Sequence, residues 1–101
     1  MNDIRSGSSG HFSTSFLLLA QYGGKAAIPV EDVCRGYFNH LTPEKFLRKV
    51  AAGDIPIAVI RAEASQKCQK SIHLQDLADY LDNRRAAALK EFQQLHRGFH
   101  D

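Results

Sequence analysis

Residues 41–61, LTPEKFLRKVAAGDIPIAVIR, predict a short helix that runs into a strand. Thr42 can cap this helix, Pro43 suits its first position, and Gly53 ends it. At 3.6-residue spacing, its apolar and basic residues fall on opposite sides. The inward residues are Phe46, Leu47, Val50 and Ala51, and the outward basic residues are Lys45, Arg48 and Lys49. The DNA major groove admits a helix of this kind, although a solvated surface helix has the same pattern.

The composition is that of one soluble globular domain. Of the 101 residues, 44% are hydrophobic and 24% are charged, which allows a modest core but not two domains. The longest apolar run, residues 16–20, is far shorter than the roughly 20 residues of a membrane span and has no signal-peptide flanks. We therefore expect a cytoplasmic, nucleoid-associated protein with no membrane partner.

The cysteines and histidines show no catalytic or metal-binding pattern. Cys34 and Cys68 lack ligand spacing, so we expect a small core residue at 34 and an exposed or half-exposed thiol at 68. His73 is expected to end a strand or cap a helix. The sequence contains no activated nucleophile, no phosphate-binding glycine loop and no carboxylate pair beside a histidine. We therefore predict no enzyme activity, no metal and no cofactor.

Positive charge is concentrated in the middle of the chain. The net charge is only +2. Residues 45–70 nevertheless contain six basic and two acidic residues, whereas residues 75–95 contain three basic and four acidic ones. This distribution is typical of a nucleic-acid-binding face.

Upstream patterns predict two more helices. Residues 1–15, with SGSSG at 6–10, predict a flexible arm or an expression scar. The run FLLLA fits a buried helix or a strand, and we favour a helix over 16–22 that Gly23 and Gly24 end. A short extended piece at 26–28 precedes a helix that Pro29 opens. With the helix at 43–52, this second helix forms a helix-turn-helix pattern.

Downstream patterns predict a hairpin and a long helix. Strands at 55–61 and 71–73 enclose a polar, basic tip and form a wing. The helix that starts at Leu74 outruns a small core, so its far half is a candidate dimer contact, through Leu81, Ala88, Leu89, Phe92 and Leu95. Arg85 interrupts this stripe, and a fold-back of the helix end on residues 16–22 is the alternative to a homodimer. The predicted fold is mostly α with a small β-hairpin: a winged helix-turn-helix domain with a long C-terminal helix over 16–95, and a frayed tail at 96–101.

Several stretches resemble the pyocin activator protein (PrtN) family of phage-derived transcription regulators. The resemblance runs from about Phe16 to Leu95 and is carried by LLLAQYGGKAAIPVEDVC, LTPEKFLRKVAAGDI, SQK and HLQDLADYLD. The order of elements is more loosely similar to the winged helix of excisionase and MerR-type proteins. The resemblance implies a sequence-specific activator of pyocin or prophage genes, which binds double-stranded DNA at promoter elements. Separately, Asp76, Asp79 and Asp82 predict a solvated acidic edge, and the alternative is a contact surface for RNA polymerase or a partner regulator.

The resemblance also implies the DNA-binding surface. Helix 43–52 would lie in the major groove and the wing at 61–70 on the phosphate backbone. The implied residues are Lys45, Arg48, Lys49, Arg61, Ser65, Gln66, Lys67 and Lys70. Two alternatives remain: an excisionase-like architectural protein that bends DNA, and a protein-interaction module that acts through the long C-terminal helix.

Overall fold

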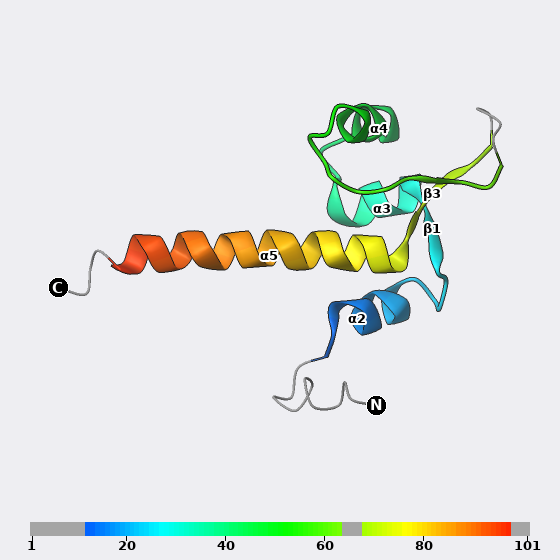
Figure 1. Cartoon of the computed structure of the whole chain (residues 1–101). Helices are drawn as coiled ribbons and strands as arrows, with labels where there is room; N and C mark the ends of the chain where they lie inside the picture. The colour runs from blue at the N-terminus through cyan, green and yellow to red at the C-terminus, as the bar shows by residue number, and fades with distance from the viewer. Residues whose placement is uncertain (1–11, 64–67, 98–101) are drawn as a thin grey trace.

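The computed structural model describes residues 12–63 and 68–97. Over these ranges the chain is mostly helical, with a small sheet and a long C-terminal helix, which confirms the predicted fold class (Figure 1). The elements follow in the order α2 (Thr14–Gln21), β1 (Ala27–Pro29), α3 (Val30–Tyr37), α4 (Pro43–Ala51), β2 (Ile60–Arg61), β3 (Lys70–His73) and α5 (Leu74–Arg97).

The first helix begins earlier than the sequence predicted. The Ser13 hydroxyl accepts a hydrogen bond of 3.1 Å from the Phe16 amide, so α2 starts at Thr14, inside the segment predicted to be a flexible arm. Gly23 and Gly24 end the turn after α2 with φ of 66° and 82°, a backbone conformation that side chains disfavour.

The sheet has three antiparallel strands in the order β1-β3-β2, not the two of the predicted hairpin. The additional strand is β1, which comes from the extended piece before α3. It pairs with β3 so that Ile28 lies opposite Ile72, and both side chains are buried. The two strands therefore bring a pair of isoleucines into the core.

The predicted strand over 55–61 is wrong for most of its length. Its last two residues, Ile60 and Arg61, pair with β3. The preceding residues pair with no strand among the described residues, and Ile55 and Ile57 are buried in the core. The chain turns tightly at Pro56, where the Ile57 amide donates a hydrogen bond of 2.9 Å to the Ile55 carbonyl. Pro56 between them has no amide hydrogen to donate to a ladder. This segment therefore packs on the core and adds no further residue pairs to the β2–β3 hairpin.

The two helices predicted to form a helix-turn-helix pattern correspond to α3 and α4. Thr42 Oγ1 accepts a hydrogen bond of 3.2 Å from the Lys45 amide and caps α4, as the sequence predicted. Phe46 is fully buried beneath α4, and its ring centroid lies 4.9 Å from that of Phe38 in the turn. This aromatic contact fixes α4 on the domain.

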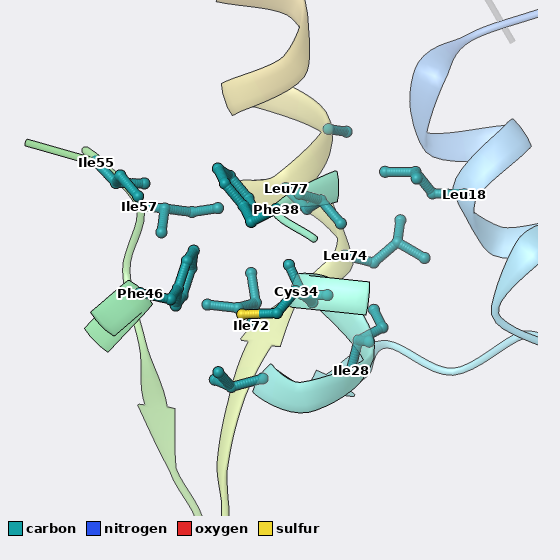
Figure 2. Close-up of a cluster of buried hydrophobic side chains, with 13 residues drawn as sticks. Leu18, Ile28, Cys34, Phe38, Phe46, Ile55, Ile57, Ile72, Leu74 and Leu77 are labelled. Atoms are coloured by element: carbon teal, nitrogen blue, oxygen red, sulfur yellow. The ribbon is translucent and has the colours of Figure 1, made fainter. Parts of the chain in front are cut away.

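An apolar core lies between α3, α4, the sheet and the first turns of α5, and α2 covers one side of it (Figure 2). Cys34 is part of this core, as predicted, and burial raises the pKa of its thiol. The core consists of Leu18, Ile28, Val30, Val33, Cys34, Phe38, Phe46, Ile55, Ile57, Ile72, Leu74, Leu77 and Ala78.

The long helix α5 leaves the domain halfway along its length. Its first turns are buried through Leu74, Leu77 and Ala78, and its far half projects past the other elements (Figure 1). The helix α2 lies along the first half, where Thr14 Oγ1 donates a hydrogen bond of 2.5 Å to Asp82 Oδ1. Because α5 runs on unbroken to Arg97, its end does not fold back on α2.

Candidate nucleic-acid interface

The helix α4 presents a basic stripe on the side away from the core. Lys45, Arg48 and Lys49 are all exposed, whereas Phe46 is fully buried. The three basic residues line one shallow depression together with Ala52 and Asp54. The structure thus brings together the three α4 residues that the sequence assigned to one face.

Asp54 is an acidic residue of this surface that the sequence reasoning missed. Gly53, with φ of 84°, turns the chain back, and the Asp54 amide donates a hydrogen bond of 2.9 Å to the Lys49 carbonyl. The carboxylate therefore lies at the C-terminal end of the basic stripe. The sequence signal was available, because a glycine at a helix end places the next residue beside the last turn.

The base of the wing places two positive charges opposite each other. Arg61 on β2 and Lys70 on β3 are paired in the ladder register, so their Cβ atoms lie about 5 Å apart. Arg61 is exposed and Lys70 is half-buried. The other predicted wing residues, Ser65, Gln66 and Lys67, lie outside the described residues.

A second depression lies between the wing base and α4. Pro43 and Leu47 of α4 line it, with Val30 and Glu31 of α3 and residues 68–70 of the wing. Lys70 therefore lies near the start of α4. Glu31 of α3 is a further acidic group beside the wing.

Lys45 and Lys49 of the basic stripe lie on one flank of α4, and the wing base lies on the opposite flank. At 3.6 residues per turn, Pro43 and Leu47 face away from Lys45 and Lys49. Arg48 lies between the two flanks, on the side of α4 opposite the buried Phe46. A ligand that touches both basic sets must therefore span the width of α4.

His73 and Cys68 make structural hydrogen bonds. His73 Nδ1 accepts a hydrogen bond of 3.0 Å from the Gln75 amide, so it caps α5 as the sequence predicted. Cys68 is half-buried, and its thiol donates to the Glu63 carbonyl at 3.1 Å. Residues 12–63 and 68–97 contain no group of three side chains able to hold a metal ion. Within the same ranges, no helix has the length and apolar character to cross a membrane.

When the chain is compared with known protein families, it matches the model of one family. A family model described as pyocin activator protein PrtN matches residues 14–88, which include every element from α2 to the middle of α5. No curated protein and no solved structure matches the chain significantly.

Proposed function

Because the chain belongs to the pyocin activator protein PrtN family, a family of regulators and not of enzymes, we propose that it activates transcription by binding double-stranded promoter DNA through α4. The observation that carries this proposal is the placement of α4. The helix is fixed on the core by Phe46, its outer side is exposed, and basic residues lie on both of its flanks.

This placement suits a helix inserted in the major groove. A helix in the groove faces the base edges with its outermost side, here called its crest, and faces the two phosphate backbones with its flanks. Arg48 at the crest can donate two parallel hydrogen bonds to a guanine edge. Lys45 and Lys49 on one flank, and the wing on the other, would contact phosphates.

The wing base supports the same arrangement. Arg61 and Lys70 lie opposite each other in the ladder of β2 and β3, so a single phosphate group can lie close to both side chains. The carboxylate of Asp54 would confine phosphate contact on its flank to the first turns of α4, since phosphate is repelled near the carboxylate.

Selection of bound sequences from a random DNA pool, followed by binding measurements on the selected site, tests the proposal. We expect Arg48→Ala to weaken specific binding by about 1 to 3 kcal/mol and to relax the preference at one base position.

The matched control is Arg35→Ala. Arg35 is an exposed arginine of α3 that pairs with Asp32 at 2.7 Å, and its removal changes the net charge equally. The α4 assignment is refuted if Arg48→Ala retains both affinity and base preference. A transcription assay with RNA polymerase on the selected promoter then separates an activator from a protein that only bends DNA.

A further inference from the structure

The helix α2 is apolar on nearly all sides. Its sequence, TSFLLLAQ, contains no charged residue, and Leu18 is the buried one. Phe16, Leu17 and Leu19 remain 53%, 52% and 43% exposed. A helix that is hydrophobic all round is normally buried, so we expect another apolar surface to pack on the outer face of α2.

The far half of α5 also exposes large apolar side chains. Leu89, Phe92 and Leu95 are 43%, 55% and 68% exposed. At helical spacing, Phe92 and Leu95 continue the face that buries Leu74 and Leu77 in the domain. The chain's own core thus covers the first half of this apolar face and leaves the second half open.

The two apolar surfaces adjoin. The hydrogen bond from Thr14 to Asp82 fixes the start of α2 where α5 leaves the domain. Leu89 lies seven residues after Asp82, so it points to the side of α5 on which α2 lies. The stacked rings of Phe12 and Phe16, with centroids 5.2 Å apart, lie at this same end of α2.

We propose that a second copy of this chain covers both surfaces, with the far halves of the two α5 helices packed antiparallel and each helix end lying beside the partner's α2. At roughly 200 Å² per large side chain, the exposed fractions of the apolar residues on α2 and α5 present on the order of 600 Å² per copy. A stable interface takes about 800 Å² from each partner, and a monomer rarely exposes so large an apolar patch.

Charge determines the orientation. The first part of α5, residues 74–83, contains three aspartates and no basic residue, whereas residues 84–97 contain four basic residues and one acidic residue. Parallel helices would place Arg85, which interrupts the apolar stripe, beside its own copy. Antiparallel helices centred near Ala86–Ala88 place Arg84 and Arg85 close to Glu91 of the other copy. The alanines at the centre allow close approach of the two helices.

Sedimentation of the full chain without DNA tests self-association independently of the proposed function. We expect dimers at tens of micromolar, and an increase of about tenfold or more in the dissociation constant for Phe16→Glu and for Phe92→Glu. The control is Gln94→Glu, because Gln94 lies on the opposite side of α5. Circular dichroism establishes that each variant retains its helices.

A monomeric native chain overturns the proposal. Equal behaviour of Phe16→Glu and Gln94→Glu would remove α2 from the interface, and with it the proposed arrangement.

Disulfide trapping in a Cys68→Ser background tests the orientation. Ala88→Cys lies near the centre of the antiparallel pair and should cross-link two chains, whereas Leu95→Cys should not. Cross-linking through position 95, or through neither position, contradicts the antiparallel pairing.

Discussion

Gly36 of α3 and Tyr22, which follows α2, make a contact whose energy can be measured. The Tyr22 hydroxyl is buried and has no hydrogen-bond partner among the described residues. The Cβ of an alanine at position 36 would lie 2.9 Å from the Tyr22 hydroxyl oxygen, closer than real contacts allow. Since Gly36 is helical, alanine would otherwise stabilise α3 by up to about 1 kcal/mol. The two effects oppose each other.

We therefore expect Gly36→Ala to give little or no gain in the free energy of unfolding while Tyr22 is present. Tyr22→Phe removes the oxygen, and because an unpartnered buried hydroxyl costs about 1 to 3 kcal/mol, it should itself stabilise the chain. In the Tyr22→Phe background, Gly36→Ala should recover its gain. The expected coupling energy is about 1 kcal/mol.

Urea unfolding of the four proteins of this cycle, followed by circular dichroism at one fixed concentration, measures the coupling. Tyr37→Phe serves as the control background, because the Tyr37 hydroxyl donates to Gln21 Oε1 at 2.6 Å and not toward Gly36. An equal effect of Gly36→Ala in all three backgrounds would refute the steric reasoning.

Three further predictions concern the cap, the wing and pH. Thr42→Ala should lower the free energy of unfolding by about 1 kcal/mol in urea titrations, whereas Thr42→Ser should not, because serine keeps the capping oxygen. Replacing Arg61 and Lys70 by alanine should weaken binding to all DNA sequences alike and reduce the salt slope by about one per lost phosphate contact; an unchanged slope would place the wing base away from DNA. Burial raises the pKa of the Cys34 thiol and of the Tyr22 hydroxyl in the folded chain, so loss of these protons favours the unfolded chain. The free energy of unfolding should therefore be constant below the ordinary pKa values of the two groups and should fall as the pH rises above about 9. Constant stability up to pH 11 in urea titrations would contradict this prediction.

The sequence determined the features that depend on neighbours along the chain. Capping by Thr42, the first-turn proline and the stop at Gly53 each act within a few residues, and they placed α4 correctly. Periodicity likewise placed Lys45, Arg48 and Lys49 on one exposed face. Local signals left helix and strand open for the run FLLLA, of which the favoured helix is confirmed by α2, and they predicted that His73 ends a strand or caps a helix, of which it does both.

The tertiary structure decided the pairings between distant segments. The strand β1 exists because Ile28 and Ile72 share the core, and the segment with Ile55 and Ile57 stays unpaired because the core takes its side chains. Neither fact is visible in local spacing. The position of the wing base on the flank of α4 opposite Lys45 likewise follows from how β3 packs against α3, which in turn packs against α4. Capping and periodicity are short-range effects, whereas burial is shared by residues far apart in the chain, so only the folded structure determines how the elements combine.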